Sequence, residues 1–164
     1  KKRGVKPLSL YTQQIGTFLS EISAPTVLMT DIAGIMPYYA GMQVYVRDLF
    51  GLTDIHNAKY GDAFCAPAEG GICGRTDYSY SFSTPFDIFI YNAYQINGRF
   101  ITFCRENPAS CQKYQFFVKE EWLKASIFVV ADINHPVAKA LVDKFNITSL
   151  PVTENLLNVI EKYK

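Results

Sequence analysis

The side chains best suited to chemistry lie in the first third of the chain, where acids and aromatic residues gather. Asp31 and Asp48 each end a run of β-branched and apolar residues, and Tyr38 and Tyr39 lie between them. Two carboxylates beside two tyrosines indicate a cradle for a sugar or a lipid-phosphate headgroup, with or without a cation. We name six candidate ligand-binding residues: Asp31, Tyr38, Tyr39, Asp48, Asp54 and His56.

Each acid also has a structural interpretation, which the sequence favours. Asp31 is expected to end a strand and to cap the helix that follows, because its carboxylate would meet unpaired N–H groups there. Asp48 and Asp54 are typical turn and cap residues. A lone His56 is more often a surface or core residue than a general base. We therefore assign no catalytic residue.

Two predicted strands position these acids. The segments 26–31 and 43–48 are separated by eleven residues, about the shortest connection (on the order of 10 to 12 residues) that can join parallel strands. We expect a compact βαβ unit. The carboxyl ends of parallel strands meet at one edge of a sheet, where ligands commonly bind, and both aspartates would lie there.

The same stretch resembles a known protein family. The pattern D-x-A-G-x-x-x-Y-Y runs from Asp31 to Tyr39, and R-D-L-F-G-L-T-D runs from Arg47 to Asp54. Together with the helical segment around Gly16, they resemble the C-terminal region of polytopic membrane glycosyltransferases of the C-type superfamily. The resemblance covers roughly the first third of the chain.

This resemblance implies a function and a place. The parent enzyme would transfer a sugar from a polyprenyl-phosphate donor to a glycan or lipid acceptor at the bacterial inner membrane, with this domain facing the periplasm. The transmembrane region would precede Lys1 and be the domain's partner. Because the family's catalytic acid lies in an early loop near those spans, no catalytic residue carries over. The resemblance implies no cofactor in this domain, although a divalent cation could serve the full-length enzyme.

The four cysteines come as two local pairs, Cys65 with Cys73 and Cys104 with Cys111. Their spacing does not match structural zinc motifs, so we assign no metal. Two local disulfides are favoured over free buried thiols, and they indicate an oxidising compartment such as the periplasm. The basic start of the chain (Lys1, Lys2 and Arg3) is more typical of the cytoplasmic side of a membrane, but it is short.

Composition excludes several classes of protein. A net charge of +1 over 164 residues gives no general attraction for nucleic acid. No apolar run approaches the roughly 18 residues of a membrane span. Phosphate-binding loops, hydrolase elbows and zincin motifs are also absent. The length suits a single domain, residues 1–164, in which 1–8 are expected to be a juxtamembrane stub.

The rest of the chain predicts an α/β fold. We expect strands at 86–91, 113–119 and 126–131, and helices that begin near Ser9, Asn134 and Glu154. The segment 92–106 is ambiguous because Asn97-Gly98 interrupts it. We interpret residues 61–85 as a disulfide-stapled loop with an aromatic row at Tyr78 and Tyr80, which is either an edge strand, the favoured alternative, or a sugar- or lipid-binding surface.

These elements predict one α/β sandwich with a mostly parallel or mixed sheet of about five strands and helices on both faces. The favoured function is that of an assisting domain in a membrane glycosyltransferase. One alternative is a periplasmic module that binds glycan or protein without enzymatic activity. Another is a stand-alone enzyme in which Asp31 and Asp48 act as general acid and base.

Overall fold

The computed structural model describes residues 8–32, 34–51, 54–65, 73–153 and 155–162, except for the side chains of residues 64, 65 and 73. The helices are α1 (Leu8–Ser20), α2 (Ile35–Ala40), α3 (Ile55–Tyr60), α4 (Tyr78–Ser83), α5 (Gln95–Glu106), α6 (Pro108–Cys111), α7 (Glu120–Lys124), α8 (Pro136–Phe145) and α9 (Asn155–Glu161). The strands are β1 (Thr26–Thr30), β2 (Val44–Asp48), β3 (Asp62–Cys65), β4 (Cys73–Thr76), β5 (Ile88–Tyr91), β6 (Tyr114–Val118), β7 (Phe128–Asp132) and β8 (Thr148–Pro151). None of the described helices is long and apolar enough to span a bilayer.

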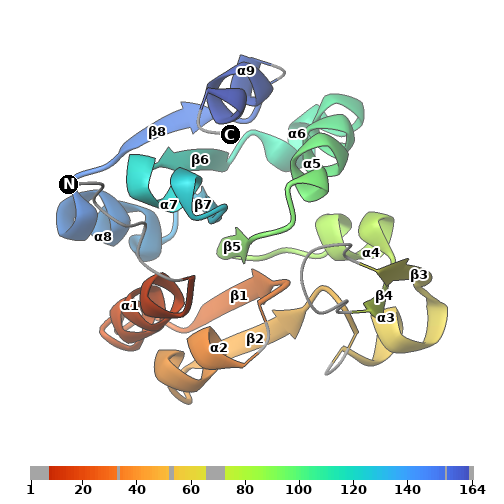
Figure 1. Ribbon diagram of the computed structural model, residues 1–164, viewed down its shortest axis with the longest axis horizontal. Coiled ribbons are helices and arrows are strands. Elements are labelled where there is room, and N and C mark those ends of the chain that lie inside the picture. Colours follow the sequence, from red (N-terminus) through yellow and green to blue (C-terminus); the bar gives the residue numbers. More distant parts are fainter. Residues whose placement is uncertain (1–7, 33, 52–53, 66–72, 154, 163–164) are drawn as a thin grey trace, which may run out of the picture.

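The centre of the molecule is a mixed six-stranded sheet in the order β2-β1-β5-β7-β6-β8 (Figure 1). Strands β2, β1 and β5 are parallel, whereas β7, β6 and β8 pair in antiparallel fashion. The predicted βαβ unit is confirmed, since β1 and β2 are parallel neighbours joined through α2. The prediction of five strands missed β8, whose residues are exposed or half-buried and show no apolar alternation.

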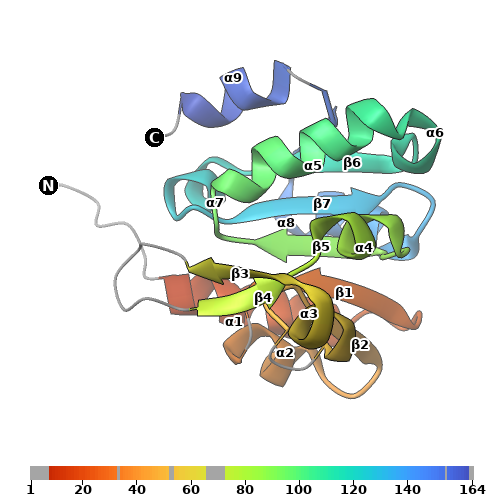
Figure 2. The same ribbon diagram turned by 90° about the vertical axis from the view of Figure 1, so that its right-hand side faces the viewer.

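Helices cover both faces of the sheet, as the sequence predicts. Leu28, Ile88 and Ile90 point toward α1, α2 and α8. Met29 and Phe89 point the other way, toward α4, α5 and α9. Figure 2 shows α4 and α5 in front of the sheet and α8 behind it. The alternation follows from strand geometry, because successive side chains project to opposite faces.

The contact between α1 and α2 depends on Gly16. A Cβ atom at this position would lie 2.5 Å from the carbonyl oxygen of Met36 and 2.8 Å from Cβ of Tyr39. Glycine in a helix interior costs about 1 kcal/mol relative to alanine. Here it allows the two helices to approach closely, so α2 is held in place beside β2.

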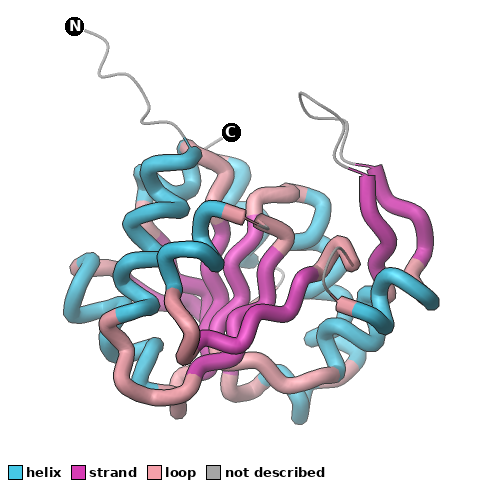
Figure 3. Tube along the Cα trace, turned by 90° about the horizontal axis from the view of Figure 1, so that it is seen from below, coloured by secondary structure: helices cyan, strands magenta, loops and turns pink. Residues whose placement is uncertain are grey.

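The described residues of the predicted 61–85 loop, 61–65 and 73–85, contain regular secondary structure that the sequence does not suggest. The predicted loop contains the antiparallel hairpin β3–β4 and the helix α4. Figure 3 shows this hairpin standing apart from the main sheet. The alternation of Tyr78, Tyr80 and Phe82 favoured an edge strand, and that prediction is wrong. Asp77 caps α4 by accepting a hydrogen bond from the backbone N–H of Tyr80, so the segment is helical.

One of the two expected disulfides lies among the described side chains. Cys104 at the end of α5 is bonded to Cys111 in α6, and both residues are buried. The β3–β4 register places Cys65 opposite Cys73. The side chains of this second pair lie outside the described part of the structure.

Two helices add detail to the prediction. Helix α1, expected to begin near Ser9, begins at Leu8, so Ser9 lies within it. Helix α5 runs through the Asn97-Gly98 step that made 92–106 ambiguous. Asn97 is accommodated because its side chain accepts a hydrogen bond from the hydroxyl of Tyr91 at 2.6 Å and donates one to the carbonyl of Tyr94.

Candidate functional site

Asp31 lies at the carboxyl end of β1, buried between two parallel strands. The backbone N–H of Asn92, just after β5, donates to both carboxylate oxygens at 2.9 and 3.1 Å, and that of Ala93 donates at 3.0 Å. Burial raises the pKa of Asp31 to about 7, although these hydrogen bonds oppose the rise, and the charge of Asp48 adds to it. The prediction that Asp31 caps the next helix is wrong, because Gly34 occupies the N-cap of α2 without a side-chain hydrogen bond.

The position of Asp31 coincides with the topological switch point of the sheet. From β1 the chain enters α2 on one face, whereas from β5 it enters α5 on the opposite face. Open α/β sheets bind ligands in the crevice between two such strands. Here the carboxylate of Asp31 reaches from β1 to the segment after β5. It accepts the backbone N–H groups that an anionic ligand would otherwise bind.

Asp48 lies at the same edge of the sheet, as the sequence predicts, and it also bonds a backbone group. Its carboxylate accepts a hydrogen bond from the N–H of Phe50 at 2.9 Å. Asp54 caps α3 by accepting a hydrogen bond from the N–H of Asn57 at 2.9 Å, which confirms its cap role. Asp31 and Asp48 are 5% and 2% exposed. Neither acid is therefore exposed to solvent, as a pair of ligand-binding or catalytic carboxylates would be.

Tyr38 and Tyr39 lie on α2 and are exposed, unlike the two buried acids. Tyr38 is 81% exposed and Tyr39 is 39% exposed. Their rings contact each other edge to face, with centroids 5.2 Å apart. The carboxylate of Asp31 is bonded instead to the backbone after β5. In the predicted cradle the two acids are therefore buried, whereas the two tyrosines face solvent.

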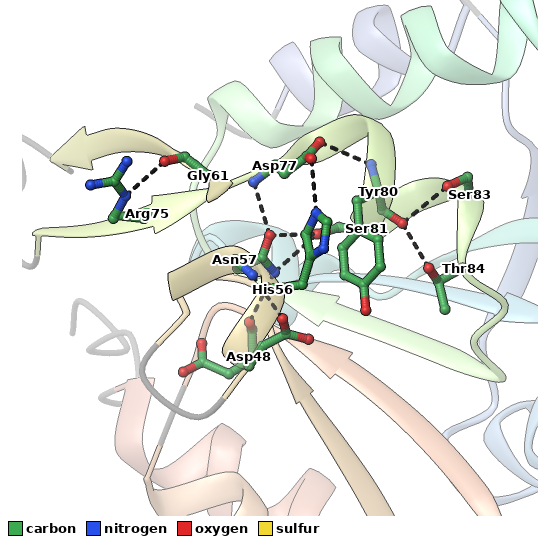
Figure 4. Close-up of polar contacts among 11 residues, drawn as sticks. Asp48, His56, Asn57, Gly61, Arg75, Asp77, Tyr80, Ser81, Ser83 and Thr84 are labelled. Atoms are coloured by element: carbon green, nitrogen blue, oxygen red, sulfur yellow. Dashed lines mark hydrogen bonds and ion pairs between the residues drawn. The ribbon is translucent and has the colours of Figure 1, made fainter. Parts of the chain in front are cut away.

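His56 belongs to a second cluster, which the fold assembles from α3, β4 and α4 (Figure 4). Its Nε2 lies 3.1 Å from Oδ2 of Asp77, and its ring stacks on Tyr80 with centroids 3.6 Å apart. The hydrogen bond from the N–H of Tyr80, followed by the one with His56, lowers the pKa of Asp77. The guanidinium of Arg47 lies 5.6 Å from the centroid of the same Tyr80 ring. Tyr80, predicted as part of an aromatic row, thus becomes a platform for His56.

Asn57 joins this cluster to the strand edge. Its amide nitrogen donates to the carbonyl of Asp48 and to the hydroxyl of Ser81, and its amide oxygen accepts from the N–H of Asp77 (Figure 4). The side chain is 1% exposed. Buried amides are stabilising only when their hydrogen bonds are made, and this one fixes α3 against both β2 and α4.

A solvent-facing hollow of about 320 Å³ opens beside the cluster. Tyr60 is 60% exposed at its rim. The guanidinium of Arg99 lies 4.5 Å from the centroid of the Tyr78 ring, and the Tyr78 hydroxyl is buried with no hydrogen-bond partner among the described residues. The lining residues are Tyr60, Asp62, Thr76, Asp77, Tyr78, Ser79 and Arg99.

A second hollow of about 280 Å³ adjoins the first. It lies between α4 and α5 and shares Tyr78, Ser79 and Arg99 with its neighbour. The stacked pair of Arg99 and Tyr78 therefore stands between the two hollows. Of the predicted site residues, Tyr78 alone lines both of them.

Sequence reasoning missed Asp77, Tyr60, Asp62 and Arg99. The aspartate before a short aromatic run is an N-cap signal that was available in the sequence. No local sequence signal predicts a role for Arg99, since its contact with Tyr78 joins residues far apart in the chain. Within the described residues, His, Cys, Asp and Glu side chains do not gather in any group of three or more that could hold a metal ion.

Comparison with known proteins identifies no relative: no protein-family model, no curated protein and no solved structure matches this chain.

Proposed function

We propose that this chain is the extracytoplasmic C-terminal domain of a bacterial membrane glycosyltransferase that uses a polyprenyl-phosphate sugar, and that the domain binds a glycan without catalysing transfer. The D-x-A-G and R-D-L-F-G-L-T-D segments support the family assignment. The Cys104–Cys111 disulfide supports an oxidising compartment such as the periplasm.

The observation that carries the binding role is the hollow beside α4. It combines the exposed ring of Tyr60 with the charged side chains of Asp62 and Arg99. Aromatic rings present an apolar face on which a sugar ring can stack, and planar charged groups bond hydroxyl groups. A volume near 320 Å³ is at the lower end of small-molecule sites, about 300–1,000 Å³, which suits a short glycan.

The strand-edge acids support a non-catalytic role. A general acid or base must reach the proton that it transfers. Both carboxylate oxygens of Asp31 instead accept backbone N–H groups, and Asp48 is buried at the end of β2, where it accepts the N–H of Phe50. The proposal therefore places ligand contact at the hollow and keeps Asp31 and Asp48 as structural residues.

Backbone NMR of the chain titrated with neutral sugars tests the binding role. The probes are glucose, galactose and mannose and their disaccharides at millimolar concentration. We expect shifts that saturate at residues 60, 62, 76–79 and 99 and that disappear in Tyr60→Ala and Arg99→Gln. The matched control is Tyr45→Ala, which removes a similarly exposed ring that is not part of this lining. No saturating shift in this set with any probe would overturn the proposed binding site.

The coding sequence upstream of Lys1 tests the family assignment. We expect several segments of at least roughly 18 apolar residues, as a polytopic membrane region requires. An open reading frame without such segments would overturn the glycosyltransferase assignment. The alternative function, a periplasmic binding module that uses the hollow, would then be favoured. Enzymatic turnover by this chain alone would contradict the assisting role.

A further inference from the structure

Strand β2 forms one margin of the sheet, and its backbone bonds to β1 on one side only among the described strands. The N–H of Leu49 donates to the carbonyl of Thr30. Because the direction of backbone groups alternates along a strand, the N–H and C=O groups of Tyr45 and Arg47 also point toward β1. The N–H and C=O of Val46 and the C=O of Val44 therefore point away from the sheet.

The two ends of this outer edge are closed within the chain. The N–H of Val44 donates to the carbonyl of Gly41, and the carbonyl of Asp48 accepts bonds from Gly51 and Asn57. The open part is centred on Val46. Unpaired strand edges are templates for pairing with another strand, and proteins usually protect them with lysine, proline or a covering element.

Within the described part of the chain, β2 contains no lysine or proline and no strand pairs with its outer edge. Residues 32–46 contain no Asp, Glu, Lys or Arg. Figure 1 shows β2 and α2 together at this margin of the molecule, with α1 on the inner side. Large apolar side chains are exposed along both elements and their connection: Ile35, Tyr38, Tyr39, Met42 and Tyr45, with Met42 fully exposed.

We propose that this edge binds a second copy of the chain, with two β2 strands pairing antiparallel about a two-fold axis through Val46. In this register the two Val46 residues exchange both backbone hydrogen bonds, which satisfies the outward donor and acceptor of each. The axis is perpendicular to the sheet, so both α2 helices lie on the same face beside the seam. Their exposed rings then supply apolar contact on that face.

Self-pairing also suits the opposite face of the sheet. Antiparallel pairing about Val46 places Tyr45 of each copy opposite Arg47 of the other, so the two-fold axis creates this pair two times. Tyr45 is 68% exposed and lies on the face where the guanidinium of Arg47 contacts Tyr80. Arg47 itself is 7% exposed and its guanidinium donates a hydrogen bond to the carbonyl of Thr84, so on this face the exposed ring of Tyr45 supplies the side-chain contact. The edge is thus complementary to itself in its backbone, as an isologous interface requires.

Sedimentation equilibrium over roughly a hundredfold range of concentration tests the pairing. We expect a reversible dimer. Val46→Pro removes the outward N–H without touching the bonds to β1, since proline is tolerated on edge strands in this orientation. Tyr45→Lys places like charges at the seam. Each variant should weaken the dimer by at least about tenfold, while circular dichroism remains native.

The matched control is Tyr60→Lys, which charges a similarly exposed tyrosine (60% against 68%) away from the edge. It should dimerise like the wild type. A monomer at all concentrations, or a dimer that survives Tyr45→Lys, would overturn the proposal. So would a folded Val46→Pro variant that still dimerises, because association would then not use strand pairing. If Val46→Pro does not fold, Tyr45→Lys decides the question.

Discussion

Acidic and aromatic side chains gather in two regions of the molecule, and the fold uses them differently. At the carboxyl ends of β1 and β2, Asp31 and Asp48 are buried and bonded to backbone N–H groups. Beside α4, Tyr60 and Arg99 remain exposed around a hollow. The first arrangement holds strands together, whereas the second leaves side chains available to a ligand. Residue type alone does not distinguish a structural acid from a functional one; burial and hydrogen-bond partners do.

Asn57→Leu should break the link between the two regions and have the largest effect. The substitution removes bonds to the carbonyl of Asp48 and the N–H of Asp77 in a site that is 1% exposed. Buried polar groups left without partners cost about 1–3 kcal/mol each. We expect the free energy of unfolding to fall by about 3 kcal/mol in urea denaturation.

The control is Asn158→Leu, an exposed position in α9, which should change stability by less than about 0.5 kcal/mol. A loss below about 1 kcal/mol for Asn57→Leu would show that α3 and α4 are held without this amide.

Asp31 should make the stability of the domain fall as pH rises. Burial raises its folded pKa from 3.8 to about 7, so between these values the folded state binds more protons than the unfolded state. The free energy of unfolding then decreases with pH in this window, by up to about 1.4 kcal/mol per pH unit. Asp77, whose pKa is lowered, contributes in the opposite direction and only at lower pH.

Urea denaturation between about pH 5 and pH 8 measures this slope. We expect a decline of roughly 2 kcal/mol in the wild type that is absent in Asp31→Asn, since an amide cannot ionise. Its single oxygen, placed where Oδ2 lies, still accepts the N–H groups of Asn92 and Ala93. Asp87→Asn is the matched control: Asp87 accepts the N–H of Val27 at the other end of β1. It should retain the wild-type slope. An identical slope in Asp31→Asn would contradict the assignment.

The sequence predicts the strand framework well because its signals are local. The runs 26–31, 43–48 and 86–91 contain β1, β2 and β5, and the eleven-residue connection correctly indicates parallel pairing. The helix expected to begin near Asn134 is α8, and His135 caps it by accepting the N–H of Val137. Such features depend on neighbours in the chain, which a sequence displays directly.

The hollow could not be predicted in the same way. The aromatic alternation of Tyr78, Tyr80 and Phe82 spans one short helix, too brief for periodicity to separate helix from strand. His56 meets Asp77 only because α3 and α4 are folded together around Asn57. Arg99 comes from α5, in the segment whose helix the Asn97-Gly98 step obscured. Each contact joins separate elements, so it appears only with the tertiary structure.

Substitutions in the hollow should have the smallest effect on stability, which would complete the contrast with the strand edge. Arg99 is exposed and its one described contact is with the ring of Tyr78. An exposed cation–π contact is worth about 0.5–1 kcal/mol. Tyr60→Ala and Arg99→Gln should therefore each lower the free energy of unfolding by less than about 1 kcal/mol in urea denaturation. Ser83→Ala, an exposed change at the end of α4, serves as the control. A loss of about 2 kcal/mol or more at either position would mean that these side chains support the fold, and the hollow would lose its distinction from the buried acids.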